Sequence, residues 1–132
     1  MPNSQTHLHS VTNILQQPEA RTVLPWLFED PARCAFLLGA ISPDVRAISG
    51  QAREETHFFD IPFSSEQPAQ AIMLARWPQI KDARALTHPQ AAFIAGYITH
   101  LVMDQTWVEM IVLPGLFIKI WPLVREMVWR EL

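Results

Sequence analysis

An imidazole and a carboxylate stand four residues apart in the apolar stretch from Gly96 to Gln105, as His100 and Asp104. In an α-helix, residues i and i+4 lie on one face, one above the other, so this spacing aims both side chains at one place. A carboxylate buried without a partner costs several kcal/mol. The fold must therefore bring a cation, a metal ion or a strong hydrogen-bond donor to Asp104.

The placement of proline and glycine favours an all-α fold. The chain has 132 residues, enough for one domain with its own core, and contains 11 prolines but only 4 glycines. Many of the prolines stand at plausible helix starts, which is typical of short helices with sharp joints rather than of a sheet. Alternating strand patterns, internal repeats and low-complexity tracts are lacking. We therefore predict one all-α domain over residues 1–132, a compact multi-helix bundle.

Periodicity and end-capping residues predict where the helices lie. The expected helices are 7–17, 30–39, a short helix or turn at 51–59, a helix capped by Ser65 and ending near residue 77, and a long helix at 90–113. A last helix follows Gly115 and should be interrupted at Pro122. It forms an apolar C-terminal tail at about 115–132.

Composition argues against several classes of protein. The net charge is -3 and Lys and Arg form no dense patch, so we expect no nucleic-acid partner. Cys34 is the only cysteine, which excludes an intrachain disulfide. The first ten residues lack the layout of a secretory signal, and no window holds about 18 uninterrupted apolar residues. We expect a soluble, cytoplasmic protein.

The apolar surface of the tail must be buried, either by packing onto the body of the protein or by contact with a partner. It is rich in Leu, Ile, Val, Phe and Trp. An apolar surface of this kind is typical of a contact with another subunit or with a membrane face. A homo-oligomer and a membrane-surface contact both remain open.

Other residues of the types that bind metals in proteins are spread along the chain. His57 lies in a charged stretch closed by two phenylalanines, and Asp44 follows Pro43 in a loop at a helix end. A single histidine beside aromatic residues is more often a packed core residue, and an aspartate in Ser-Pro-Asp is usually a turn former. His100 with Asp104 is the stronger signal, although a buried hydrogen bond between them would explain the spacing without a metal. His88 is interpreted as a helix-start residue with no chemical role.

Four blocks in a fixed order resemble the zinc-dependent phospholipase C family, which is related to the S1/P1 nucleases. The blocks are Thr6-His7-Leu8, the loop 39–44 (GAISPD), Thr56-His57-Phe58 and the segment 92–105, which contains GYITHLVMDQ. They cover about residues 6 to 107, and the loop 39–44 and the segment 92–105 are the most specific. The resemblance implies an all-α fold of that type and hydrolysis of phosphate esters with a cluster of up to three zinc ions.

The resemblance also implies a role for each matching residue. Asp44, His57, His100 and Asp104 match the ligands of one zinc site, and Asp44 matches the usual general-base candidate. His7 matches the histidine that binds a second metal with the carboxylate at Asp104. His9 is the alternative N-terminal ligand if the first helix is shifted by half a turn. Two neighbouring metal ions suit phosphoester hydrolysis, because they clamp phosphoryl oxygens and lower the pKa of bound water.

The chain departs from the family in two respects. Secreted members begin with a tryptophan that binds metal, whereas this chain begins with Met-Pro. The family's third site needs two further histidines and a glutamate after the position of Asp104, and no histidine follows His100. The resemblance therefore implies a shortened member with one or two zinc ions, and the third site is expected to be absent.

Other classes of enzyme and metal protein fit the sequence less well. Adjacent His-Asp pairs, as in one class of phosphohydrolase, are absent, and so is the Gly-x-Ser-x-Gly elbow of serine hydrolases. Glu54 and His57 have the Glu-x-x-His spacing of di-iron proteins, but no second such motif occurs. We therefore expect a zinc-dependent phosphodiester hydrolase whose substrate is a small phosphoester or a lipid head group. The alternative is a non-catalytic helical module that binds metal or mediates assembly.

Overall fold

Two long helices form the centre of the fold. The structure is a computed structural model that describes residues 2–61, 63, 65–120, 122, 123 and 125. Helix α3 (Asp30–Ile41) packs along helix α7 (His88–Trp107), and this is the most extensive contact between two elements. No strand occurs among the described residues, which confirms the all-α prediction.

Two glycines allow α3 and α7 to approach closely. A Cβ atom at Gly39 of α3 would collide with the backbone carbonyl of Phe93 on α7. A Cβ atom at Gly96 of α7 would collide in the same way with the carbonyl of Phe36 on α3. The two backbones therefore touch, and the positions of functional groups on the two helices are fixed relative to each other.

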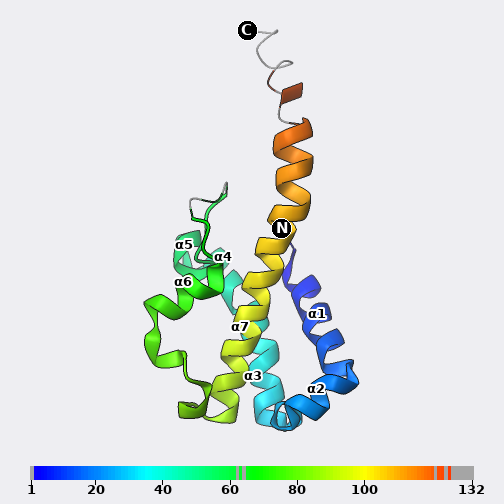
Figure 1. The fold of residues 1–132 in the computed structure, drawn as a ribbon, viewed down its shortest axis with the longest axis vertical. Helices are drawn as coiled ribbons and strands as arrows, with labels where there is room; N and C mark the ends of the chain where they lie inside the picture. Colours follow the sequence, from blue (N-terminus) through cyan, green and yellow to red (C-terminus); the bar gives the residue numbers. More distant parts are fainter. Residues whose placement is uncertain (1, 62, 64, 121, 124, 126–132) are drawn as a thin grey trace.

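The N-terminal elements cover one side of this pair (Figure 1). They are α1 (Ser4–Gln16), α2 (Pro18–Val23) and the 3-10 turn η1 (Pro25–Phe28). Their apolar side chains complete a first core with α3 and α7, whose buried members are Val11, Leu27, Ala32, Phe36, Ala40 and Ala92.

A series of short elements covers the other side (Figure 1). They are η2 (Ser42–Val45), α4 (Arg46–Ser49), α5 (Arg53–Thr56), α6 (Ala69–Arg76), η3 (Pro78–Ile80) and η4 (Ala83–Ala85). They build a second core against α7, whose buried members are Phe58, Phe59, Ala69, Met73, Leu101 and Val108.

Several helix boundaries differ from the predictions. Helix α1 begins at Ser4, three residues early, because the side chain of Asn3 accepts the Thr6 amide and caps the helix. Helix α6 begins at Ala69 after Pro68, so the prediction that Ser65 caps it is wrong. Ser65 instead accepts the Gln67 amide at 3.1 Å in the preceding turn.

The C-terminal helix also differs from the prediction. Helix α7 passes without interruption into a π-helix, η5 (Val108–Ile120), which runs through Pro114 and Gly115. The predicted break after Leu113 is therefore wrong. The predicted interruption at Pro122 is not tested, because residues 121 and 124 lie outside the described residues. Residues 126–132 of the predicted tail also lie outside them.

The continuous helix bears on the earlier search of the sequence for a membrane span, which found no uninterrupted apolar window of sufficient length. The stretch His88–Ile120 is long and apolar enough to cross a membrane, with a mean hydropathy of 1.4 over its best window. Length and composition are weak evidence for a span, because core helices of soluble proteins pass the same test. The first part of this stretch, helix α7, packs against α3 along the bundle.

Candidate metal centre

Helix α7 supplies the central pair of the site. His100 and Asp104 are 0% and 1% exposed and lie one turn apart on the face of α7 that is turned into the bundle. His100 Nε2 lies 3.7 Å from Asp104 Oδ2. The spacing that was read from the sequence therefore does place both groups at one buried point.

Helix α1 supplies a second imidazole. His7 is 1% exposed, and its Nε2 lies 3.2 Å from Asp104 Oδ1. The ring of His7 stacks on that of His100 with the centroids 3.6 Å apart. His9 points away, is exposed, and pairs with Asn13 at 3.1 Å. Of the two histidines, His7 lies in the cluster and His9 does not.

The short elements after α3 supply the remaining two candidates. Asp44 lies in η2, and its Oδ1 is 3.6 Å from His57 Nε2 and 3.8 Å from His100 Nε2. His57 follows α5 directly, and its Nε2 lies 3.5 Å from Asp104 Oδ2. All five predicted ligands therefore converge, from four separate parts of the chain.

Hydrogen bonds from the far side of two rings fix their orientation. His100 Nδ1 lies 2.7 Å from the carbonyl oxygen of Ala40, to which it can only donate. The Thr56 hydroxyl donates to the Arg53 carbonyl at 3.4 Å, so it can accept from His57 Nδ1, which is 2.9 Å away. His100 Nε2 then carries a lone pair and faces the cluster, and so does His57 Nε2 in the tautomer whose Nδ1 donates to Thr56. Backbone and side-chain partners of this kind orient histidine ligands in metal sites.

Two ring nitrogens that face each other this closely need a proton or a metal ion between them. The Nε2 atoms of His57 and His100 are 3.3 Å apart. Two ligands at zinc-to-nitrogen distances of about 2.05 Å and a tetrahedral angle lie about 3.3 Å apart. Five nitrogen-to-oxygen separations in the cluster run from 3.2 to 3.8 Å. The spacing of the donors thus suits a shared ion.

Buried polar atoms without hydrogen bonds mark the same place. Neither ring nitrogen of His7 has a hydrogen-bond partner among the described residues, and the same holds for Asp104 Oδ1. His7 Nε2 and Asp104 Oδ1 are close, at 3.2 Å, but their geometry does not make a hydrogen bond. Most buried polar atoms in proteins are satisfied, so an exception calls for an explanation. A metal ion between these two atoms provides one.

The donors form two overlapping groups, each able to hold a metal ion. One group is His7, His100 and Asp104, and the other is Asp44, His57 and His100. Within each group, the ligand atoms lie within 4.8 Å of one another. Because His100 belongs to both groups and has one nitrogen facing the cluster, it can serve one ion directly. The residues therefore suit one or two ions, with imidazole and carboxylate ligands that zinc accepts.

Charges around the cluster favour the ligand forms of these groups. Burial tends to raise the pKa of Asp104, but the close approach of His100 and His7 outweighs it and holds the pKa well below its usual range. Burial lowers the pKa of His57, and the nearby Arg53 lowers it further. A neutral imidazole and an ionised carboxylate are the forms that bind metals.

Asp44 differs from the other four ligands in its exposure. Its side chain is 32% exposed, whereas those of His7, His57, His100 and Asp104 are at most 1% exposed. It lines a cavity of about 300 Å³ together with Ser4, Leu38, Ile41, Ser42, Val45 and Ile48. Burial raises the pKa of Asp44, but His57, His100, His7 and Ser4 together hold it below the usual value. Solvent therefore reaches the cluster at an ionised carboxylate.

The sequence did not reveal several groups at the site. Arg53 Nη2 lies 3.4 Å from Asp104 Oδ2, and Ser4 donates to Asp44 Oδ2 at 3.2 Å. Phe58, directly after His57, adopts a positive φ of 60°, a conformation that is costly for a bulky residue and concentrates at functional sites. Arg53 and His57 are four residues apart in the sequence, but this local spacing does not indicate that Arg53 contacts the distant Asp104.

The remaining histidine stays outside the site. His88 stacks on Trp26 with ring centroids 5.0 Å apart, and its Nδ1 is 3.6 Å from Glu29 Oε2. It lies at the start of α7, where a role in the helix start was predicted.

Comparisons with protein-family models, with curated proteins and with solved structures found no match to this chain. The assignment of a function therefore depends on the geometry of the cluster.

Proposed function

We propose that this protein is a metal-dependent phosphoester hydrolase of the zinc-dependent phospholipase C type. The observation that carries the proposal is the convergence of three imidazoles and two carboxylates whose donor atoms face one another at distances that suit a shared ion. The five residues are the ones that match that family's zinc ligands in the sequence. Their convergence in the fold supports the resemblance.

Each residue has a role in this proposal. His7, His100 and Asp104 would hold one zinc ion, and His57 and Asp44 would hold a second ion or complete the first. Bound zinc supplies a water of lowered pKa and positive charge for phosphoryl oxygens. The Ala40 carbonyl and the Thr56 hydroxyl keep the histidine nitrogens turned inward. Asp44 reaches the solvent-facing edge, where its carboxylate can accept a proton from an attacking water.

A non-catalytic metal-binding module is the second candidate. Four of the five ligands are almost completely buried, as in structural sites that are closed to solvent. Such a module would bind zinc with the same residues and gain stability without turning over a substrate. The exposure of Asp44 favours the hydrolase, because a closed structural site has no use for a solvent-facing ligand.

Activity and metal content must be measured together. We would assay the purified chain with bis(4-nitrophenyl) phosphate, a generic phosphodiester, as prepared, after chelation, and after zinc is returned. The hydrolase predicts turnover that chelation abolishes and zinc restores. Bound zinc without turnover in any state would favour the structural module, and a chain that binds no zinc would exclude both.

The Asp44→Asn variant tests the proposed proton acceptor. Removal of a general base usually costs about 10²–10⁴-fold in rate, so kcat should fall by that order. Asp82→Asn is the matched control, since Asp82 is an exposed carboxylate that pairs with Arg84 away from the cluster. Equal activity of the two variants would remove Asp44 from the mechanism.

A further inference from the structure

The helix that continues α7 projects beyond the rest of the molecule (Figure 1). Ile118, Lys119 and Ile120 are three consecutive residues and all are exposed. Successive residues point about 100° apart in an α-helix and somewhat less in the wider π-helix, so three exposed neighbours span about half of the circumference. About half of the circumference at this end of η5 is therefore open to solvent.

The projecting helix is apolar around its circumference. Between Glu109 and Lys119, no residue carries a charge. Met110 and Ile118 are 69% and 70% exposed, and Ile120, which is nearly opposite Ile118, is 47% exposed. A helix that is apolar on all sides is typical of complete burial, in a protein core or in lipid.

The distribution of these side chains around η5 distinguishes between a second copy of the chain and lipid as the partner that covers the helix. A helix from a second copy would cover one stripe of η5 and leave the opposite residues in water. Lipid acyl chains surround a helix and cover Ile118 and Ile120 together.

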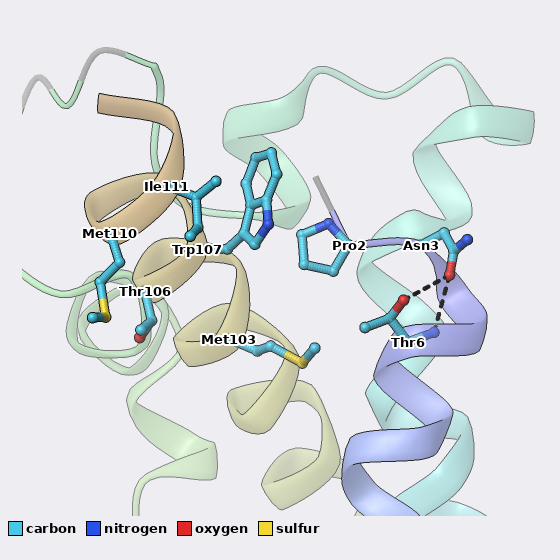
Figure 2. A pocket seen from close by; sticks show the side chains of 8 residues that line it. All are labelled: Pro2, Asn3, Thr6, Met103, Thr106, Trp107, Met110 and Ile111. Carbon is cyan, nitrogen blue, oxygen red and sulfur yellow. Dashed lines mark hydrogen bonds between the residues drawn. The ribbon is translucent and has the colours of Figure 1, made fainter. Parts of the chain in front are cut away.

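The apolar surface continues into a cavity where the helix leaves the bundle. Figure 2 shows Met103, Trp107, Met110 and Ile111 on one wall, opposite Pro2 at the start of the chain. The cavity measures about 560 Å³. Methionine and tryptophan are flexible or flat apolar groups that accommodate chains of variable shape. The cavity and the projecting helix form one apolar region.

We propose that η5 and the cavity at its base bind a lipid bilayer, with residues 110–118 in the acyl region. The contact needs neither zinc nor the cluster, so it is independent of the proposed hydrolase activity. Helix α7 remains in the bundle, because its buried residues Ala92, Gly96 and Leu101 already pack within the protein. The bilayer therefore receives the projecting part of the helix only.

Vesicle flotation tests this proposal on the full chain. Vesicles of phosphatidylcholine carry no net charge, so they report the apolar contact. We expect most of the protein to float with the vesicles, and Ile118→Asp or Met110→Asp to reduce the floated fraction at least fivefold. Val23→Asp is the matched control, because Val23 is 72% exposed on α2, and it should float like the unchanged protein. Circular dichroism verifies that each variant keeps its helices.

Three results would overturn the proposal. First, the unchanged protein could fail to float with the vesicles. A constant dimer mass in light scattering would then show that a second copy covers η5. Ile118→Asp and Met110→Asp could float as well as the unchanged chain. Val23→Asp could lose flotation as strongly as Ile118→Asp, so that the contact is not specific to η5. Flotation after chelation should equal flotation with zinc, whether or not the protein hydrolyses a phosphoester.

Discussion

His7 and His9 lie two residues apart on α1, but their side chains point to different faces of the helix. His7 is buried against Asp104, while His9 is exposed beside Asn13. We expect His7→Ala to weaken zinc binding at least tenfold and His9→Ala to leave it unchanged. Titration calorimetry with zinc measures both. Equal affinities in the two variants would contradict the assignment of His7 as a ligand.

Tyr97 connects α7 to the segment that presents His57. Its hydroxyl donates to the carbonyl of Thr56 at 2.6 Å, and burial raises the pKa of Tyr97 to about 12. An unfolded tyrosine loses its proton near pH 10, so between about pH 10 and about 12 the folded state binds more protons. Stability should therefore fall as the pH rises through this range.

The Tyr97→Phe variant should lack this pH-dependent loss. At neutral pH it should be about 1 kcal/mol less stable, because one hydrogen bond is missing. Urea unfolding at neutral and alkaline pH measures both effects. Tyr97 is the only tyrosine in the chain, so the change in absorbance on ionisation reports this residue directly. A stability difference between the two proteins that does not change with pH would contradict the inference.

The types of residue at the site could be predicted, but their partners could not. His100 and Asp104 carry their geometry in the spacing of a single helix. Asp44 and His57 were weak candidates on their own, and only the resemblance joined them to α7. The Ala40 carbonyl and the Arg53 guanidinium act through contacts across 60 and 51 residues of sequence. Local patterns do not encode such contacts, because they depend on how α3, α5 and α7 pack.

At the scale of elements, the contact between α3 and α7 sets the dimensions of the site. The Ala40 carbonyl on α3 holds His100 on α7, so any separation of the helices moves a ligand. Gly96→Ala places a methyl group against the Phe36 carbonyl and should destabilise the protein by about 1–3 kcal/mol or more. Zinc affinity should fall with it, and denaturant unfolding with calorimetry measures the two together.

Gly115→Ala is the control for this substitution. Nothing lies within 4 Å of a Cβ atom at Gly115, and alanine has the higher helix propensity. This variant should be as stable as the unchanged protein, or more stable, with the same zinc affinity. If Gly96→Ala behaves like Gly115→Ala, the close approach of the two helices does not determine the site.

Helix boundaries were predicted best where a local capping group decides them. Thr87 caps α7 through a reciprocal pair with Gln90, and Pro31 stands in the first turn of α3, as their sequences indicate. Ser65 has the side chain of a cap, but the chain turns again and α6 starts after Pro68. Pro114 was read as a helix end, whereas the helix continues through it as η5. A proline removes one hydrogen bond, and that loss does not by itself decide where a helix stops.

For the whole molecule, the cluster joins parts of the chain that are far apart in sequence. The ligands come from α1, η2, the residue after α5, and α7. An ion bound there would connect the N-terminal side of the bundle to the short elements on the other side. Binding to the folded state alone stabilises a protein by mass action, about 2.7 kcal/mol when free zinc exceeds its Kd a hundredfold. Metal affinity and folding stability should therefore change together.

This coupling predicts the thermal behaviour of the protein. Zinc at that excess should raise Tm by on the order of 10 °C in a domain of this size. The increase should disappear in His100→Ala, which removes the donor shared by both groups, and shrink in Asp104→Asn, which removes a donor from the first group only. It should persist in His88→Ala, whose imidazole lies outside the cluster beside Trp26. It should also shrink as the pH is lowered, because protons compete with zinc for its ligands. Calorimetric scans with and without zinc measure each case, and an unchanged zinc response in both ligand variants would remove the metal centre from the account of this fold.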